Sequence, residues 1–372
     1  MKEIIKRLIP VEVRLRIIAF LFRICVVPFS LLPAKNRVLF YSIRDNNRLL
    51  ENSRAVWDAL DCEKIMFAHK LPHSFGQSLK ACFLLRTSKI IVTDDYCKYM
   101  RLMKLGKKQK LFQIWHGCGA FKSFGLDAPS LLTKEQERKT HARYDAVAVT
   151  GEGCRKYFAG AFGVSEEICL PVGLPGTDYL VNNGDELRDD MLDRHPELRG
   201  KTVYLYCPTF REKDGVKTNF NPGIDWEKLS GSLKEDELFI VSRHPLMDYE
   251  LIEGRFDNVF DMTEESTLSL AAVSSVLVTD YSSTVHDAVL LGVPVVFYCP
   301  DCADYERKFY LNFPDDLPGD MIMNSGELID AVRRTKENPP TAKIERFRSE
   351  QLSACDGHST ERVRDIIYGW LK

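Results

Sequence analysis

The sequence predicts an α/β protein in which two doubly wound, Rossmann-type domains face each other across a cleft. Its length of 372 residues is typical of two domains. Short runs of β-branched residues alternate with helical patterns along most of the chain, which predicts parallel sheets with helices on both faces. A polar, strongly charged stretch at residues 182–201 separates two such series, and we interpret it as the connector between the domains.

The first domain is expected at residues 34–181. Its apolar runs have the length of buried strands, and helical patterns separate them, with Ser53 as a possible cap of the first helix. The predicted strands cover residues 38–43, 64–68, 89–93, 110–114 and 146–150, and the predicted helices cover residues 52–60, 77–86 and 98–105.

The second domain is expected at residues 202–343, followed by one or two helices at residues 344–372. Here too the strands alternate with helical segments, as in a parallel sheet. The predicted strands cover residues 203–207, 238–242, 259–261, 276–279 and 295–298.

Residues 276–298 form the most informative stretch, because they read as a strand, a tight turn, a helix and a second strand. Ser282 and Ser283 occupy N-cap positions, and Gly292 stands where the helix should end. In a parallel sheet this turn lies at the carboxyl end of its strand, where the free N–H groups of the next helix form an anion site. The alternative is an ordinary turn that binds nothing.

The amino-terminal segment, residues 1–33, contains six basic and two acidic residues among many apolar ones. Arg23 and Pro28 interrupt the apolar run, which is therefore shorter than a membrane-spanning helix requires. We expect a basic amphipathic segment that holds the protein peripherally on an anionic membrane surface, at its cytoplasmic face. The alternative is a helix packed on the protein's own domain.

The overall charge excludes one class of partner. Lys plus Arg is 51 and Asp plus Glu is 53, which gives a net charge of −2 and argues against a dedicated nucleic-acid binder. The 11 cysteines show no disulfide framework or zinc spacing, and Cys299 and Cys302 form a lone CxxC. This usage fits a reducing cytosol.

A histidine directly follows the strand at residues 110–114, in the sequence Trp115-His116-Gly117. At this edge of the sheet, glycine lets the backbone approach a ligand closely, and histidine can accept a proton from a hydroxyl near neutral pH. Lys122 could hold a phosphate as a point charge. The alternative is a structural turn around a buried histidine.

Two further motifs stand at predicted strand ends. Arg243 and His244 follow one strand, and Thr209 and Arg211 follow another. Arginine matches phosphate oxygens, and histidine supplies a donor or an acid. Each pair has a structural alternative, but their common position at carboxyl ends of strands predicts a phosphate-rich ligand between the two domains.

A basic cluster within the first domain is interpreted either as a solvated helix face or as a rim that attracts a polyanionic acceptor or lipid headgroups. It comprises Lys98, Arg101, Lys104, Lys107, Lys108 and Lys110.

At these motifs the chain resembles the CDP-glycerol glycerophosphotransferase family, whose members include the primases and polymerases of teichoic acid synthesis. The resemblance covers roughly residues 36–335. It departs from the family pattern at Gly176, where an arginine is common, and at His286, where a phenylalanine is common. The matching elements are Trp115-His116-Gly117 with Lys122, Pro208-Thr209-Phe210-Arg211, His244-Pro245, Thr279 to Ser283, Asp287 to Tyr298, and Asp301, Tyr305, Pro318 and Gly319.

The resemblance implies a GT-B-like fold, with a first domain for the acceptor and a second domain for the CDP-polyol. It implies transfer of glycerol phosphate from CDP-glycerol to a hydroxyl of a lipid-linked or polymeric cell-surface glycan, with release of CMP. The motifs contain no DxD-like pair or carboxylate cluster that demands a metal, so we expect no metal or other cofactor. The expected catalytic residues are His116 as the base, His244, and Asp145 as a residue that orients His116. The expected substrate-binding residues are Trp115, Gly117, Lys122, Thr209, Arg211, Arg243, Thr279, Asp280, Ser282 and Ser283.

Other functions remain open at this point. The transferred group could be ribitol phosphate from CDP-ribitol, or the protein could be a nucleotide-sugar glycosyltransferase or epimerase of similar fold. A non-enzymatic module that binds anionic polymers on the membrane surface would leave the ordered strand-end motifs unexplained.

Overall fold

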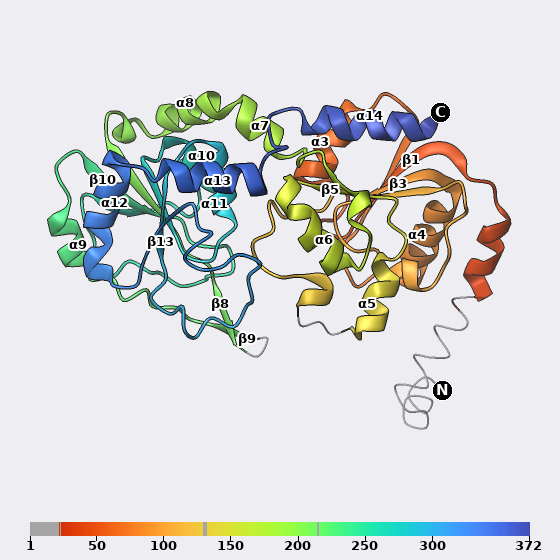
Figure 1. Ribbon diagram of the computed structural model, residues 1–372, viewed down its shortest axis with the longest axis horizontal. Helices are drawn as coiled ribbons and strands as arrows, with labels where there is room; N and C mark the ends of the chain where they lie inside the picture. Colours follow the sequence, from red (N-terminus) through yellow and green to blue (C-terminus); the bar gives the residue numbers. More distant parts are fainter. Residues whose placement is uncertain (1–21, 23, 129–131, 214–215) are drawn as a thin grey trace, which may run out of the picture.

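The computed structural model describes residues 22, 24–128, 132–213 and 216–372, which form two α/β domains side by side (Figure 1). The first domain is built on a parallel sheet of order β2-β1-β3-β4-β5-β6. Its strands are β1 (Lys35–Ser42), β2 (Lys64–Ala68), β3 (Ser88–Thr93), β4 (Lys110–Gln113), β5 (Ala146–Val149) and β6 (Cys169–Pro171).

The second domain repeats this plan with a parallel sheet of order β11-β10-β7-β12-β13-β14. Its strands are β7 (Thr202–Cys207), β10 (Glu237–Val241), β11 (Val259–Asp261), β12 (Val276–Thr279), β13 (Val295–Tyr298) and β14 (Gly319–Ile322), and a separate hairpin joins β8 (Arg211–Lys213) to β9 (Val216–Thr218).

Helices cover both faces of each sheet, because crossover connections between parallel strands place them there. Apolar side chains of the central strands, such as Leu39 and Ile91, are paired and fully buried. The prediction of two doubly wound domains is confirmed. The helices are α3 (Glu51–Ala59), α4 (Phe75–Thr87), α5 (Lys134–His141), α6 (Arg155–Phe162), α7 (Thr177–Asn182), α8 (Gly184–Arg194), α9 (Trp226–Ser232), α10 (Thr267–Val273), α11 (Thr284–Leu290), α12 (Leu328–Glu337), α13 (Thr341–Gln351) and α14 (Ser359–Leu371).

The stretch at residues 182–201, which we interpreted as the connector between the domains, is largely helical. Most of it is α8, which packs against α10 (Figure 1). Met191 is fully buried in the core of the second domain, and Leu187 and Leu192 pack against that core, so three apolar positions anchor an otherwise charged helix.

The carboxyl-terminal helices connect the two domains. α13 packs against α11 of the second domain, whereas α14 returns to the first domain, where Val363 and Ile367 enter its core. The ring of Trp370 lies 5.5 Å from that of Phe112, edge to face. The chain therefore crosses between the domains again near its end, which ties them together.

The predicted amphipathic segment lies mostly outside the described residues. Where the structure describes it, Phe22 and Val26 are buried against the first domain, and a 3₁₀ turn, η1, covers Val27–Leu31. The basic helix predicted at residues 98–105 is instead the 3₁₀ turn η2 (Lys98–Arg101). Within the described part of the chain, no helix is long and apolar enough to cross a membrane.

Candidate active site

The loops that follow β4, β7, β10 and β12 meet at a cleft between the two domains, with a cavity volume of about 470 Å³. Eight of the predicted site residues line this cleft, so the strand-end reasoning places them correctly. They are Trp115, His116, Gly117, Lys122, Thr209, His244, Ser282 and Ser283.

His116 is held in the tautomer that a general base requires. Its Nδ1–H donates to the backbone carbonyl of Asp94, with a nitrogen–oxygen distance of 2.8 Å. In the neutral ring this bond places the proton on Nδ1, so Nε2 is the nitrogen that can accept a proton. The side chain is 33% exposed and lines the cleft, so an incoming hydroxyl can reach it.

Trp115, which precedes this histidine, has a strained backbone conformation and helps to orient the imidazole. Its φ is +48°, a conformation that is costly for a bulky residue and must be imposed by its surroundings. Its N–H donates to Oε1 of Gln113 at 2.9 Å, and its carbonyl accepts from Nδ2 of Asn52 at 2.9 Å. The indole stacks between the rings of His116 and Phe124, at 4.4 and 5.2 Å. These contacts fix the direction of the imidazole.

The prediction that Asp145 orients His116 is wrong. Asp145 precedes β5 and therefore lies at the amino edge of the sheet, where it accepts hydrogen bonds from Arg143, Lys110 and the backbone of Leu111. The carboxylate near the imidazole belongs to Asp95, whose Oδ2 lies 3.9 Å from Nδ1 of His116.

His244 adopts the opposite tautomer. The backbone N–H of Leu246 donates to its Nδ1 at 3.1 Å, so Nε2 carries the proton. Burial, with the nearby charge of Lys122, lowers the pKa of His244 and favours the neutral ring. Its imidazole packs on Phe210 at 4.8 Å. The cleft thus contains one histidine that accepts a proton and another that donates a hydrogen bond.

Lys122 supplies positive charge where the two domains meet. Its backbone pairs with Phe309 of the second domain, and its ammonium lies 5.6 Å from the ring centre of Tyr305. Burial lowers the pKa of Lys122 to about 8. A cation that is partly desolvated in this way interacts strongly with an anionic ligand.

Thr209 lines the cleft, but its hydroxyl is buried. Its backbone N–H donates to both carboxylate oxygens of Asp280, at 2.9 and 3.1 Å, while its buried Oγ1 has no partner among the described residues. On the facing turn, Ser283 is the N-cap residue of α11 without a side-chain cap bond, and Ser282 Oγ accepts from the N–H of Thr284 at 3.3 Å. Both serine side chains reach the cleft, and Gly292 ends the helix at a φ of +74° as predicted.

Three residues predicted to bind substrate, Arg211, Thr279 and Asp280, lie behind the cleft wall. Arg211 donates to both oxygens of Asp301 and to the carbonyl of Thr209, and it pairs with the fully buried Asp280 at 2.8 Å. The hydroxyl of Thr279 donates to the carbonyl of Cys207. None of these residues lines the cleft. Their contacts with Thr209 and Cys207 instead hold the Thr209 loop in place.

Arg243 is engaged in the same way. Its guanidinium donates to Asp261 at 2.6 Å and to the carbonyls of Met247 and Tyr249. It therefore fixes the loop that carries His244, which corrects the predicted contact with substrate.

The cleft also contains residues that the sequence motifs did not identify. Arg307 lines it with a side chain that is 55% exposed, near Glu212 at 3.8 Å and over the ring of Phe210 at 6.0 Å. Arg307 lies in the long loop between β13 and β14, away from any strand end, so position along the chain gives no signal for it. Asp94 and Asp95 follow β3 and could have been found by the rule that found His116.

No group of three or more His, Cys, Asp or Glu side chains is placed to hold a metal ion in the described part of the chain. That the reaction needs no metal stays a prediction.

Comparisons with known proteins agree with this arrangement. The model of the CDP-glycerol:poly(glycerophosphate) glycerophosphotransferase family matches residues 33–369. The teichoic acid ribitol-phosphate primase of Bacillus spizizenii is 31% identical over 366 residues, which cover 92% of this chain and 93% of that protein. The teichoic acid glycerol-phosphate primase of Bacillus subtilis is 28% identical over 300 residues, 78% of this chain and 76% of that protein.

The fold has a solved counterpart in the wall teichoic acid polymerase TagF, with a TM-score of 0.73, 21% identity and 95% of both chains covered. This likeness confirms the predicted GT-B-like architecture. Because the family model covers nearly the whole chain, and a relative above 30% identity covers most of it, this protein belongs to the CDP-glycerol:poly(glycerophosphate) glycerophosphotransferase family.

Proposed function

We propose that this enzyme transfers glycerol phosphate from CDP-glycerol to a hydroxyl of a lipid-linked or polymeric cell-surface glycan and releases CMP. The observation that carries the proposal is the pairing of opposite histidine tautomers in one cleft. His116 presents a bare Nε2, and His244 presents an N–H, with the ammonium of Lys122 beside them. One group accepts a proton and two bind anionic oxygens.

In the proposed reaction, the acceptor hydroxyl gives its proton to Nε2 of His116 as its oxygen attacks the phosphorus that bears the polyol. The bond from this phosphorus to the bridging oxygen breaks, and CMP leaves with the bridging oxygen and its electron pair. Negative charge spreads over the transferring phosphoryl group and CMP. Lys122, Thr209 and the Nε2–H of His244 hold these oxygens, and such preorganised donors lower the barrier.

CDP-ribitol is the second candidate donor. The relative with the higher identity of the two compared above is named a ribitol-phosphate primase, and the other is named a glycerol-phosphate primase. Both donors present the same diphosphate and differ only in the length of the polyol.

Release of CMP, measured separately with CDP-glycerol and CDP-ribitol and a lipid-linked disaccharide acceptor, tests the proposal. We expect release from one of the two at a much higher rate, dependent on the acceptor. Thermal shift with CDP, UDP and GDP provides the control for a sugar-nucleotide enzyme. Stabilisation by UDP or GDP, without a response to CDP compounds, would contradict the proposal.

Raising the pH through about 8 is expected to weaken donor binding, because burial lowers the pKa of Lys122 to about 8. Below this pH the ammonium is charged, and above it the charge is lost. Near neutral pH, Lys122→Met should raise KM for the donor about 10- to 150-fold, as expected for a charge-assisted hydrogen bond of about 1.5–3 kcal/mol.

Lys122→Arg is the matched control, because arginine stays protonated throughout. Its KM should remain flat where that of the unchanged enzyme rises, from about pH 7 to 9.5 in initial-rate measurements. Parallel profiles for the two proteins would exclude Lys122 as the titrating group.

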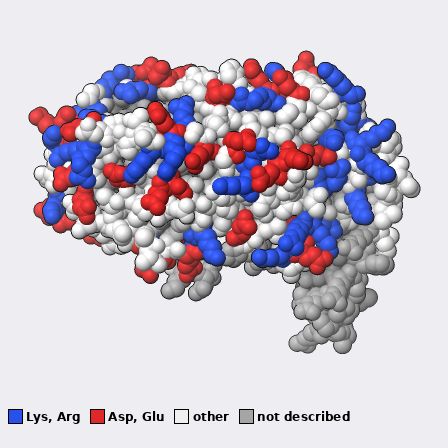
Figure 2. Space-filling view, in the orientation of Figure 1, with Lys and Arg blue, Asp and Glu red and all other residues white. Residues whose placement is uncertain are grey.

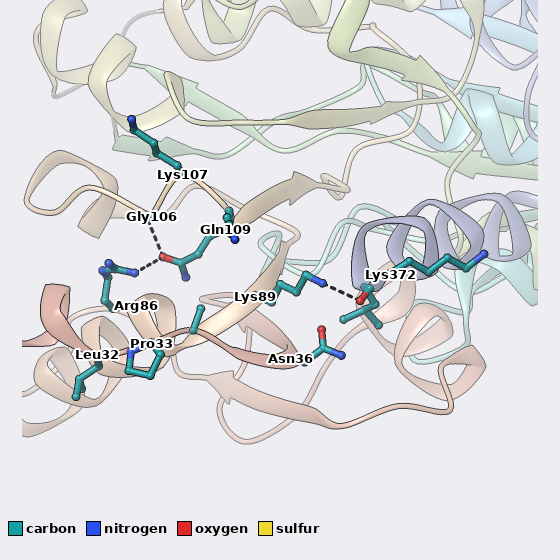
Figure 3. Close-up of a pocket in the computed structure, with 12 residues that line it drawn as sticks. Leu32, Pro33, Asn36, Arg86, Lys89, Gly106, Lys107, Gln109 and Lys372 are labelled. Carbon is teal, nitrogen blue, oxygen red and sulfur yellow. Dashed lines mark hydrogen bonds between the residues drawn. The ribbon is translucent and has the colours of Figure 1, made fainter.

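The same protein is proposed to bind the membrane peripherally, at the cytoplasmic face, through one end of the first domain. Ile24, Val27 and Leu31 leave 53, 62 and 85% of their surface exposed. Next to them lies a pocket of about 650 Å³, which Figure 3 shows between the start of the first sheet and the end of α14. Five of its lining residues carry cationic side chains, namely Arg86, Lys89, Lys107, Lys108 and Lys372.

Apolar side chains beside cations are the composition that binds an anionic bilayer surface. In the pocket, Arg86 donates to Gln109 and to the carbonyl of Ser30, while its buried Nε has no partner among the described residues. Figure 2 shows lysine and arginine side chains gathered at this end of the molecule. These features support a surface that receives phosphate headgroups.

Sedimentation with vesicles tests this surface. The double variant Lys107→Glu/Lys108→Glu should lose about tenfold or more in affinity for phosphatidylglycerol vesicles, since each lysine near an anionic surface contributes about 1 kcal/mol. Lys228→Glu/Lys234→Glu on the second domain is the matched control and should bind like the unchanged protein. Equal binding to phosphatidylcholine vesicles, or no effect of salt, would reject the surface.

A further inference from the structure

His286 is fully buried between helix α13 and the loop after β4, which carries His116 and Gly119 and is called the catalytic loop below. The rings of Phe121 and Phe347 flank its imidazole at 5.8 and 5.2 Å. Its Nδ1–H donates to the carbonyl of Ser283 at 3.0 Å, and its Nε2 has no hydrogen-bond partner within the described residues. Burial lowers the pKa of His286 to about 4, so the ring is neutral.

Gly119 of the catalytic loop packs directly on this ring. A Cβ at Gly119 would lie 2.0 Å from Nε2 of His286, and the φ of Gly119 is +66°. Only glycine permits such an approach and such a backbone. The loop is held from behind, because Gly119 N–H donates to Thr150 Oγ1 at 3.1 Å and Ala120 N–H donates to Oε1 of Gln351 at 2.8 Å.

One imidazole therefore touches both walls of the cleft. Gly119 is three residues after His116, and Ser283 is three residues before His286. Nε2 of the ring packs on the backbone of Gly119, in the wall formed by the first domain. Nδ1–H donates to the carbonyl of Ser283, in the wall formed by the second domain.

We infer that His286 is a positioning residue that sets the separation between His116 and the Ser282-Ser283 turn, through its contact with Gly119. The inference rests on the proposed transfer reaction. The base and the bound substrate must be placed to within about 1 Å, because a displacement of that size lowers the rate about 100-fold. A residue that fixes the distance between the two walls therefore affects kcat. His286 touches no reacting atom, because it is sealed from the cleft.

The test compares a single variant with a double variant. Gly119→Ala places a methyl group against the ring, and kcat should fall about 100-fold with a smaller change in KM for the donor. Gly119→Ala/His286→Ala removes the ring that the methyl group meets, so kcat should recover at least about tenfold relative to Gly119→Ala. His286→Phe keeps a ring but loses the bond to Ser283, and should be slower than the unchanged enzyme in kcat.

Gly223→Ala controls for backbone strain alone. Gly223 has the same φ of +66°, and a Cβ added there would have no atom within 4 Å. This variant should therefore have a slightly lower Tm and an unchanged kcat. A wild-type kcat in Gly119→Ala, or a double variant no faster than Gly119→Ala, would overturn the inference.

Thermal unfolding of the unchanged protein and these variants separates this inference from the proposed reaction. Partial recovery of Tm in the double variant shows the contact without any substrate, and its absence overturns the contact. If the unchanged protein is stable but releases no CMP from either CDP-polyol, the proposed function fails, and the positioning role fails with it.

Discussion

Replacing His116 with alanine is expected to lower kcat for CMP release by about 10²- to 10⁴-fold, the contribution of a positioned general base. The physical reason is the fixed tautomer, in which the bond from Nδ1 to the carbonyl of Asp94 leaves Nε2 free to take the proton. KM for the donor should change little, since the base acts on the acceptor. Tm should also change little, because the side chain is partly exposed and makes one hydrogen bond.

His358→Ala is the matched control for this variant. His358 is an exposed histidine near Glu361 on the surface of the molecule, and its loss should leave CMP release unchanged. Equal kcat for His116→Ala and the unchanged enzyme would show that another group accepts the proton.

The second large effect is expected on stability. Arg211→Met should lower the free energy of unfolding by about 3–5 kcal/mol, the cost of leaving a buried charge without its partner. The stranded group is Asp280, which is fully buried, whereas the side chain of Arg211 is 10% exposed. Tm should fall by on the order of 10 °C.

Arg307→Met distinguishes this account from a role of Arg211 in phosphate binding. Arg307 lines the cleft and is exposed, so its loss should raise KM for the donor and leave Tm nearly unchanged. If Arg211→Met instead raises KM and keeps its Tm, the sequence-based assignment of Arg211 as a substrate ligand is correct, and ours is wrong.

Most of the fold could be predicted from sequence because the central strands are buried on both faces. Such strands read as continuous apolar runs, and the predicted segments 276–279 and 295–298 match the observed bounds of β12 and β13. The edge strands β6 and β14, whose side chains are partly exposed, were missed, whereas the edge strands β2 and β11 were predicted with their observed bounds.

The site was predictable to the extent that it depends on topology. Carboxyl ends of parallel strands share one edge of a sheet, so residues such as His116, Thr209 and His244 could be brought together without coordinates. What each side chain faces could not be predicted in this way. Arg211 and Arg243 also follow strands, yet nearby carboxylates and carbonyls take up their donors.

Partner assignments failed for a related reason. Asp145 was paired with His116 from chain position alone, although it precedes its strand and thus lies at the opposite edge of the sheet. The backbone carbonyl of Asp94 holds the imidazole instead. Any residue type can supply a backbone carbonyl, so the sequence gives no signal for this partner. The contact of Gly119 with His286 joins positions 167 residues apart (286 − 119 = 167), which no local pattern encodes.

The most direct measurement is a crystal structure of the His116→Asn protein with CDP-glycerol bound. We expect the diphosphate in the interdomain cleft, within hydrogen-bond distance of Lys122, Thr209 and Nε2 of His244, with the polyol phosphorus facing residue 116. A diphosphate bound elsewhere, such as in the basic pocket around Arg86 and Lys89, or one that turns the polyol away from residue 116, would contradict the account.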